Sequence, residues 1–345
     1  KRADTYYLHY TAEPSDGIKQ IGLATSSSPT GPFVDVSDQS FYKDPNNKEI
    51  LDSHFMFDDD GKVYMYFNED LNANIVGEQR YSEIHVIEVE PDLSSTTGTA
   101  TFLARPEQDW EYSTAPGQYW NEGSYVLKRN GIYTLMYSAN CYCGKRYGVG
   151  FMTSDSPMGP FTKYDKNPVL SYEPYMDKVS GPGHHTIAMS PDNSEMIIVY
   201  HSHMDINAGG GQRMINIDRM GFREDGTIYV NGPTVTEQLI PSYGAKPFVS
   251  IGEQATLTAE RTNESYDVKA LVDGEFSMYD RFKNYEWVSD FTAGEEIEIK
   301  FEWQTDQAIE EIWFYNSIDD TRQATAARIV LNDSTEIEQV LLKKA

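Results

Sequence analysis

One 13-residue stretch occurs twice in the sequence, and this internal repeat limits the folds that the chain can adopt. Residues 21–33 read IGLATSSSPTGPF, and residues 149–161, which lie 128 positions later, read VGFMTSDSPMGPF. Eight of the thirteen positions are identical, from Gly22/Gly150 to Phe33/Phe161. Agreement of this extent indicates that the chain is built from repeated structural units.

Short strand-like stretches recur with a similar spacing. Apolar or alternating stretches begin near residues 5, 62, 132 and 196, so they are 57, 70 and 64 residues apart. Each follows a turn signal, such as Asp60-Gly61 or Asn130-Gly131, and precedes a second strand-like stretch. A period of about 60–70 residues with about four short strands is typical of the blades of a β-propeller. We therefore predict an all-β propeller, of which about four blades are present, with the two copies ending equivalent strands two blades apart.

The repeat stops around residues 240–250 (LIPSYGAKPFVS), and strand-like stretches of a different kind follow. EIEIKFEW, EEIWFYNS and AARIVLND are predicted as strands of a second, smaller domain. We predict a propeller domain over residues 1–243 and a β-sandwich of the jelly-roll type over residues 250–345.

Composition excludes several classes of function. The formal net charge is −26, which argues against binding to nucleic acid or to anionic membranes, because both need a basic face. No apolar run approaches the roughly 18 residues of a membrane span, so membrane insertion is not expected. The acidity fits a secreted or a salt-tolerant protein, and the sequence, in which no signal peptide is present, leaves both alternatives open.

The only cysteines are Cys141 and Cys143, in the pattern C-Y-C. Residues i and i+2 of a strand point to the same side, but a disulfide between them would be strained. We predict two free thiols at a strand end, and the cysteines leave the cellular compartment open.

Acidic and histidine side chains stand near the start of three successive blades. Asp52, Glu122 and His184 each precede the second strand of their blade by 10 to 13 residues. Because the inner strands of a propeller meet at its axis, these side chains are expected to lie together, where they can perform general acid–base catalysis. Asp52 on its own also fits a turn or a cap, whereas Glu122 stands out because glutamate is uncommon in strands. Residues 58–60 are predicted to form a solvent-facing hairpin turn.

These stretches resemble glycoside hydrolase family 43, whose members are five-bladed propellers that remove arabinose and xylose from plant polysaccharides. The resemblance covers residues 5 to about 240 and is carried by YYLHYTA, IGLATSSSPTGPF, LDSHFMFDDDGKVYMYF, WNEGSYVLKRNGIYTLMYSAN, VGFMTSDSPMGPF, GPGHHTI and VYHSH. It implies an exo-acting, inverting α-L-arabinofuranosidase or β-xylosidase, in which an acid protonates the leaving oxygen and a base activates water. A glycosidase for another furanose, such as galactofuranose, would share every one of these motifs.

The resemblance also implies roles for individual residues. Glu122 corresponds to the general acid, and Asp52 to the carboxylate that orients the acid and raises its pKa. His184 corresponds to an axial residue beside a calcium ion or a water; since calcium prefers oxygen ligands, waters or carbonyl groups should supply most of them. No organic cofactor is implied. The substrate-binding residues implied by the resemblance are Arg213, Trp110, Glu111, Trp120 and His54.

The family's catalytic base, an aspartate in a DP-containing motif of the first blade, has no counterpart in this sequence. The count of four strand signals instead of five agrees with a missing first blade. We expect a fragment, a short form that uses another base (Asp205 or a residue of a second subunit), or a glycan-binding propeller without catalysis. Open strand edges at the gap are expected to be covered by a homodimer contact, a covering segment or the second domain.

The C-terminal region resembles the discoidin-like jelly-roll modules that often accompany glycosidases. Trp287 and Tyr285 are candidates for sugar contacts, and a place in the core is an equally strong alternative for both rings. The expected partner of the whole protein is an arabinose- or xylose-containing oligosaccharide or polysaccharide, and the expected location is secreted or periplasmic.

Overall fold

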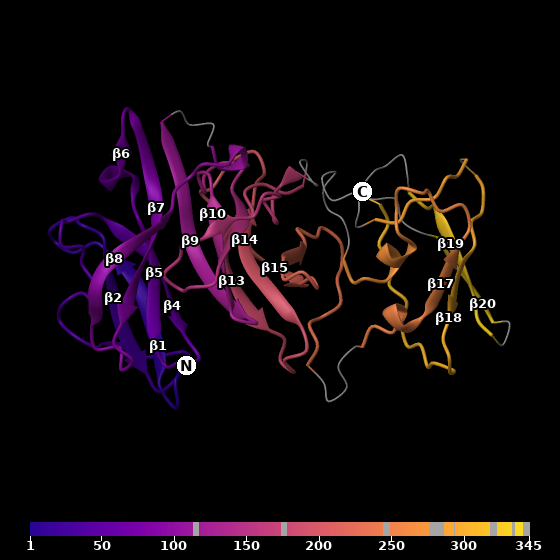
Figure 1. The fold of residues 1–345 in the computed structure, drawn as a ribbon, viewed down its shortest axis with the longest axis horizontal. Coiled ribbons are helices and arrows are strands. Elements are labelled where there is room, and N and C mark those ends of the chain that lie inside the picture. Colours follow the sequence, from indigo (N-terminus) through magenta and orange to yellow (C-terminus); the bar gives the residue numbers. More distant parts are fainter. Residues whose placement is uncertain are drawn as a thin grey trace. The chain divides into compact units, whose positions relative to one another are not determined.

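The computed structural model describes residues 1–112, 117–173, 178–243, 249–275, 286–292, 294–317, 323–332 and 335–340. Within these residues the regular structure consists of β-strands and short 3-10 helices, so the all-β prediction is confirmed (Figure 1). None of the described helices is long and apolar enough to cross a membrane.

The chain divides into two compact units. The first consists of residues 1–189 and 196–228, and the second consists of residues 190–195 and 229–345. The division at residue 228 falls before residue 243, at which the sequence predicted the end of the first domain.

The first unit contains the four groups of strands that the repeat spacing predicts (Figure 1). The first group is β1 (Tyr6–Ala12), β2 (Gln20–Ser26) and β3 (Val34–Asp35). The second group is β4 (Ile50–Phe57), β5 (Val63–Glu69), the 3-10 helix η1 (Leu71–Ala73), β6 (Ile75–Val76), β7 (Gln79–Val89) and β8 (Thr96–Ala104). The third group is η2 (Asp109–Glu111), β9 (Gln118–Arg129), β10 (Ile132–Ala139), β11 (Gly148–Ser154) and β12 (Thr162–Lys163). The fourth group is β13 (Gly183–Met189), β14 (Met196–His203) and β15 (Arg213–Phe222), and β16 (Ile228–Asn231) follows in the chain.

Within each group the main strands pair antiparallel with their neighbours in sequence, which is the pattern of a propeller blade. The orders β1-β2-β3, β4-β5-β7-β8, β9-β10-β11-β12 and β13-β14-β15 describe the four blades. The second and third blades also meet through a short parallel pairing of residues 80–82 on β7 with residues 118–120 on β9.

The two copies of the repeated stretch have the same backbone structure. The N–H of Gly31 donates to the carbonyl of Ser28 at 3.1 Å, and the N–H of Gly159 donates to that of Ser156 at 3.1 Å. Gly31 and Gly159 have φ angles of 80° and 78°, which favour glycine, and each precedes a cis proline. The copies end β2 and β11, in the first and third blades, so their predicted placement two blades apart is confirmed.

An earlier glycine in each copy makes room for an aromatic ring. A Cβ atom on Gly22 would lie 2.2 Å from the ring of Tyr10, and one on Gly150 would lie 2.6 Å from the ring of Trp110. The repeated glycine is therefore required by packing, because no larger side chain fits under either ring.

Two buried clusters form the core of the first unit. One lies between the second and third blades and includes Tyr66, Ile84, Leu135 and Tyr137. The other lies between the first and second blades and includes Ile21, Ile50, Met65 and Phe67. The first three blades thus bury apolar faces against one another, as neighbouring blades of a propeller do.

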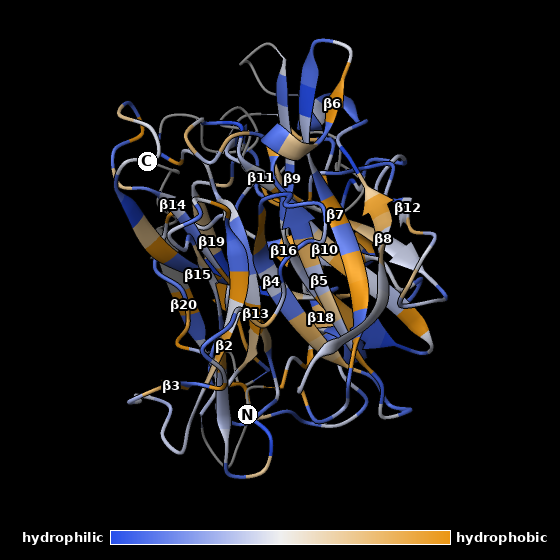
Figure 2. Ribbon diagram, turned by 90° about the vertical axis from the view of Figure 1, so that its left-hand side faces the viewer, coloured by the Kyte–Doolittle hydropathy of each residue, from blue (hydrophilic) through white to orange (hydrophobic). Residues whose placement is uncertain are grey.

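In β15 an acidic side chain is buried and two isoleucine side chains are exposed, which is the reverse of the usual arrangement in a strand. Asp218 is 5% exposed and accepts a hydrogen bond of 2.6 Å from Tyr200, whereas Ile215 and Ile217 are 81% and 49% exposed. Figure 2 shows the resulting bands of hydrophilic and hydrophobic residues along this strand.

Two local predictions in the first unit are wrong. Cys141 and Cys143 form a disulfide with a Cα–Cα distance of 5.1 Å, because they lie in a turn and not on the extended strand that the sequence suggested. The hairpin turn at residues 58–60 is present, but Asp58 does not face solvent. Its side chain is 3% exposed, pairs with Lys128, and accepts a hydrogen bond of 2.5 Å from Tyr133.

The second unit also contains strands, in two antiparallel pairs. Its described elements are η4 (Gly252–Gln254), β17 (Thr256–Ala259), η5 (Val268–Leu271), β18 (Ile299–Glu302), β19 (Ala326–Val330) and β20 (Glu336–Val340). β17 pairs with β18 and β19 pairs with β20. EIEIKFEW and AARIVLND thus contain strands as predicted, whereas EEIWFYNS (residues 310–317) forms none. The β-sandwich over residues 250–345 stays a prediction.

The two aromatic residues suggested for sugar binding in this unit have different outcomes. The indole N–H of Trp287 donates to Thr262 Oγ1 at 3.1 Å, so its polar atom is used within the fold. Tyr285 lies outside the described residues.

Candidate active site

The candidate active site is built on β4, β9 and β13, the first strands of three successive blades. Each of these strands has a bulge in its pairing with the next strand. In β4 the shift falls between Leu51 and His54, which places Asp52 in the bulge. In β9 it follows Glu122, and in β13 it follows Gly183, which places His184 in the bulge. Bulges bend a strand and re-aim its side chains, so these strands direct functional groups to one region.

The three bulges share an unusual backbone conformation. Asp52, Gly123 and His184 have φ angles of 55°, 62° and 51°, which is the left-handed region. This region is uncommon for residues other than glycine and is frequent at functional sites. Asp52 and His184 therefore occupy the same position of their bulges, whereas Glu122 lies one residue earlier, so the predicted equivalence of the three is correct to within one residue.

Glu122 has the properties of a general acid. The residue is only 7% exposed, and the hydroxyl of Tyr147 donates to its Oε1 at 2.7 Å. Burial, followed by the negative charge of Asp52, raises the pKa of Glu122 to about 8. The hydrogen bond from Tyr147 and the charge of Arg213 act in the opposite direction. Glu122 thus keeps its proton near neutral pH, as a proton donor must.

Asp52 is the neighbouring carboxylate that influences this pKa. Burial raises the pKa of Asp52, while the charge of His184 and a hydrogen bond from the backbone N–H of Gly123 favour its ionised form. The side-chain amide of Asn68, with its nitrogen turned toward β4, donates to Asp52 Oδ2 at 3.2 Å. Two adjacent carboxyl groups resist simultaneous ionisation, and these partners favour the ionised form of Asp52.

Rings stacked beside Glu122 complete the wall of the site. The Tyr147 and His201 rings stack with centroids 5.5 Å apart, and the His184 and His201 centroids are 6.3 Å apart. A Cβ atom on Gly183 would lie 2.4 Å from the Tyr147 ring, so glycine is needed there. The sequence reasoning missed Tyr147 and His201. Gly183, the second glycine of GPGHH, was the one local signal in the sequence that a ring packs against β13.

His54 and Arg213, both predicted to bind substrate, have different surroundings. His54 packs on Tyr125 at 4.3 Å, and burial lowers its pKa to about 3, so it is neutral. It lines a cavity of about 400 Å³ together with Asp52 and His184. Arg213 is exposed at the start of β15, and its guanidinium lies 5.2 Å from the ring centroid of Tyr142.

The contacts of Glu111 do not support its predicted contact with sugar. Its side chain is fully buried, and Lys163 Nζ lies 2.7 Å from Oε1, while the backbone N–H groups of Glu107 and Gln108 each donate to Oε2 at 2.7 Å. A carboxylate with these partners has a structural role.

The two tryptophans have different surroundings. Trp110 packs against the core, with its ring 5.8 Å from that of Tyr137 and its indole N–H donating to Gln108 at 2.8 Å. These contacts point to structural packing for Trp110. Trp120 is half-buried on β9, two residues before Glu122, and its contact with substrate stays a prediction.

The calcium ion expected beside His184 stays a prediction, because the described side chains around His184 supply few oxygen atoms and waters or carbonyl groups would have to supply the rest. His184 Nδ1 lies 3.2 Å from the Tyr147 hydroxyl, and the carboxylate nearest to Nε2 is Asp52, at 3.9 Å. Calcium takes about six to eight oxygen ligands. The one group of three ligand-type side chains found within the described residues is Glu69, Glu83 and His85, and Lys48 and Arg105 already pair with its carboxylates.

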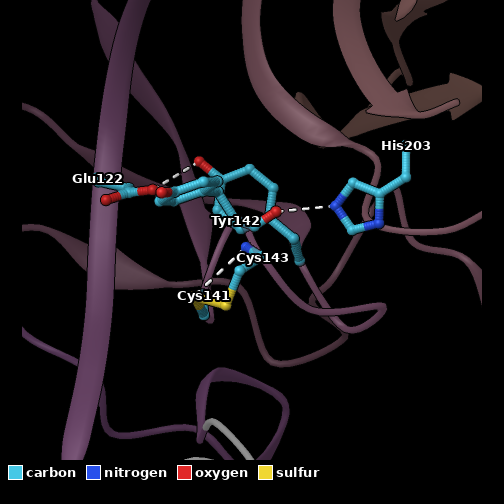
Figure 3. Close-up of a disulfide and its surroundings, with 6 residues drawn as sticks. Glu122, Cys141, Tyr142, Cys143 and His203 are labelled. Carbon is cyan, nitrogen blue, oxygen red and sulfur yellow. Dashed lines mark hydrogen bonds between the residues drawn. A yellow bond between two sulfur atoms is a disulfide. The ribbon is translucent and has the colours of Figure 1, made fainter. Parts of the chain in front are cut away.

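Figure 3 shows the turn that follows β10 beside Glu122. The Cys141–Cys143 disulfide spans this turn, and the backbone carbonyl of Tyr142 accepts a hydrogen bond of 2.8 Å from His203 Nε2. The other ring nitrogen, Nδ1, then accepts from Ser180 Oγ at 2.9 Å, which defines the tautomer of His203.

A blade-built β-structure with a proton-holding glutamic acid beside an aspartate on successive inner strands is the arrangement of a carboxylate-dependent glycoside hydrolase. The model of the glycosyl hydrolases family 43 matches residues 1–228, so the chain belongs to glycoside hydrolase family 43. A family model for a domain of unknown function, DUF7402, matches residues 250–345.

Individual relatives agree with this assignment. A β-D-galactofuranosidase of Aspergillus niger is 30% identical over 224 residues, which cover 65% of this chain and 58% of that protein. An arabinoxylan arabinofuranohydrolase of Paenibacillus polymyxa is 30% identical over 248 residues, which cover 65% of this chain and 35% of that protein. The chain thus spans 58% and 35% of the lengths of these two relatives.

A solved structure of a thermostable family-43 glycoside hydrolase superposes with a TM-score of 0.65. It is 40% identical, and the match covers 69% of this chain and 75% of that one. The propeller prediction is therefore confirmed by a relative of known structure.

Proposed function

We propose that this protein is an exo-acting glycosidase that releases arabinose or xylose from plant cell-wall polysaccharides by inverting hydrolysis. The observation that carries the proposal is the buried Glu122 beside Asp52 on successive inner strands, where burial and the charge of Asp52 raise the pKa of Glu122 to about 8. A furanoside or xyloside bond needs a proton on its leaving oxygen, and this pair is arranged to supply one.

In the proposed mechanism Glu122 transfers its proton to the glycosidic oxygen as the bond between that oxygen and the anomeric carbon breaks. The electron pair of the bond goes to the oxygen, and the new hydroxyl leaves with the remainder of the chain. Tyr147 then stabilises the carboxylate of Glu122 through its hydrogen bond of 2.7 Å. Asp52 keeps the acid protonated before the transfer through its charge.

In an inverting reaction, water attacks the anomeric carbon from the face opposite the leaving oxygen. The base that activates this water lies about 6.5–9.5 Å from the acid. We assign this base to none of the described residues. Asp205, which the sequence offered as a substitute base, is exposed. Its side chain accepts a hydrogen bond of 2.8 Å from the backbone N–H of Asn207, as expected for a turn residue.

A second candidate substrate is a β-D-galactofuranoside. The observation that favours it is the similarity to the Aspergillus niger β-D-galactofuranosidase over 224 residues. Glu122 and Asp52 would act in the same way on this substrate, because the reacting groups are again a ring oxygen, an anomeric carbon and a leaving oxygen.

We further propose that the protein works outside the cytoplasm, in a secreted or periplasmic form. The Cys141–Cys143 disulfide supports this location, because disulfides persist in oxidising compartments. A polymeric plant substrate also lies outside the cell. The homodimer expected from open strand edges stays a prediction, and the molecular mass in solution is the measurement that checks it.

The test of the proposed function is hydrolysis of three aryl glycosides: an α-L-arabinofuranoside, a β-D-xyloside and a β-D-galactofuranoside. Glu122→Gln is the test variant. Glu88→Gln is the matched control, because Glu88 is a half-exposed strand residue that pairs with Lys62 at 3.6 Å. We expect turnover of at least one substrate, reduced about 10²- to 10⁴-fold by Glu122→Gln and retained by the control. Binding of the sugar without any turnover would instead identify a glycan-binding propeller.

A further inference from the structure

The turn between β10 and β11 holds an exposed aromatic ring in a fixed position. Tyr142 is 48% exposed, although its two neighbours, Cys141 and Cys143, are joined by a disulfide (Figure 3). The disulfide closes a three-residue loop and removes most of the backbone freedom of Tyr142.

A cross-strand pair of residues contacts Tyr142 on its backbone and on its ring. His203 on β14 and Arg213 on β15 lie directly opposite each other. His203 Nε2 donates to the carbonyl of Tyr142 at 2.8 Å, and the guanidinium of Arg213 lies 5.2 Å from the centre of its ring. A cation over an aromatic face is attracted to it, so the ring as well as the backbone is held.

The glycines of NAGGGQR allow this close approach. A Cβ atom on Gly210 would lie 2.6 Å from the carbonyl oxygen of Tyr142, and one on Gly209 would lie 2.7 Å from that of Cys143. Both contacts are with backbone atoms, which cannot move aside as a flexible side chain can. The segment before Arg213 is therefore shaped to fit the turn that carries Tyr142.

The same turn leads directly into the catalytic group. Tyr147, at its end, donates to Glu122 at 2.7 Å, and the charge of Arg213 acts on the pKa of Glu122. His201 lies two residues before His203 on the same face of β14, and its ring stacks on that of Tyr147, so Tyr142 and Arg213 lie on the same side of β14 as the partner of the acid. In glycoside hydrolysis the leaving group lies beside the acid, because the acid must touch the leaving oxygen.

We propose that Tyr142 and Arg213 together form the binding surface for the sugar residue of the leaving group. The ligand class is a pentose-containing oligosaccharide, whose C–H face packs on the ring of Tyr142 while its hydroxyl groups accept hydrogen bonds from Arg213. A surface fixed before binding loses little entropy when the sugar docks, so it orients the leaving oxygen toward Glu122. This inference rests on the proposed glycosidase function.

The experiment compares two substrates in the full chain: an arabinofuranosyl-substituted xylo-oligosaccharide and α-L-arabinofuranosyl fluoride, whose leaving group is a single atom. The variants are Tyr142→Ala, Tyr142→Phe and Phe102→Ala. Phe102 is the matched control, because it is 46% exposed and lies on β8 of the second blade, whereas Glu122 lies on β9 of the third. We expect Tyr142→Ala to lower kcat/KM for the oligosaccharide at least tenfold more than for the fluoride, mainly through KM. Tyr142→Phe should keep most of this discrimination, and Phe102→Ala should leave it unchanged.

Equal losses for the two substrates in Tyr142→Ala would overturn the inference and leave the proposed function intact. Absence of hydrolysis of either substrate by the unsubstituted chain would overturn the proposed function instead. In that case, calorimetric titration of the Glu122→Gln variant with the xylo-oligosaccharide tests whether Tyr142 binds sugar. A Kd that is at least tenfold higher in the double variant Glu122→Gln, Tyr142→Ala supports a sugar-binding surface, and an unchanged Kd refutes it.

Discussion

Tyr147, at the end of the turn before β11, and Glu122, on β9, are joined by a hydrogen bond of 2.7 Å, in which the phenol donates to the carboxyl oxygen Oε1. Burial raises the pKa of Tyr147 well above its ordinary value, so the phenol stays a donor throughout the working range of pH. The bond favours the ionised form of Glu122, whereas burial and the charge of Asp52 favour the protonated form. The pKa of about 8 is therefore a balance, and the contributions of Tyr147 and Asp52 can each be removed by one substitution.

The first prediction concerns Tyr147→Phe. Activity requires the protonated acid, so it should fall as pH rises through the pKa of Glu122, near 8. Removing the phenol removes a hydrogen bond of about 1 kcal/mol to the ionised form, which moves this alkaline limb upward by about 0.7 pH unit. The measurement is kcat/KM for an aryl glycoside between pH 5 and pH 10. A limb that stays in place would show that Glu122 is not the titrating acid.

The second prediction concerns Asp52→Asn and has the opposite sign. The charge of Asp52 raises the pKa of Glu122, so the neutral amide should move the alkaline limb to lower pH, by about one unit for a like charge at such a site. The same pH–rate profile checks it. Movement of the limb in the same direction in Asp52→Asn and Tyr147→Phe would contradict the electrostatic arrangement described above.

The blades and the grouping of Asp52, Glu122 and His184 were predictable because their signals are local. A glycine-rich turn, a short apolar strand and a fixed spacing are enough to place a residue near the inner end of a blade strand. The bulges were not predictable, because the φ angle of 55° at Asp52 depends on how β4 pairs with β5.

Side-chain partners far apart in the sequence were also beyond prediction. Tyr147 lies 25 residues after Glu122, and Lys163 lies 52 residues after Glu111. Glu111 consequently resembled a pocket residue until its buried partners were seen. The cysteine prediction failed for a related reason, since it assumed an extended strand at residues 141–143, where the chain turns.

The third prediction is that acid destabilises the protein through buried histidines. Burial lowers the pKa of His185 to about 3, and both ring nitrogens lack hydrogen-bond partners among the described residues. The folded state binds fewer protons than the unfolded state below about pH 6.5, so stability is lost as pH falls from that value. Each such group contributes up to about 1.4 kcal/mol per pH unit. Glu122 acts in the opposite sense, because its raised pKa makes stability fall as pH rises toward 8.

His185→Phe isolates the contribution of one histidine. The difference in unfolding free energy between pH 7 and pH 5, measured with urea, should be smaller in this variant than in the unsubstituted chain, since the phenyl ring does not titrate. An unchanged difference would mean that His185 is not the source of the acid sensitivity.

The last prediction separates a structural role of Glu111 from a role in sugar binding. Lys163 and Glu111 form a buried ion pair, with side chains 5% and 0% exposed and a distance of 2.7 Å. Lys163→Met leaves the carboxylate of Glu111 buried without its charged partner, which should lower the free energy of unfolding by about 3–5 kcal/mol. Lys43→Met is the matched control, because Lys43 pairs with Asp16 at 2.8 Å with both side chains about two-fifths exposed, and it should lower the free energy of unfolding far less than Lys163→Met does. Urea titration measures both values. If Lys163→Met instead raises KM for the oligosaccharide and leaves stability unchanged, Glu111 belongs to the sugar-binding surface and the structural role is refuted.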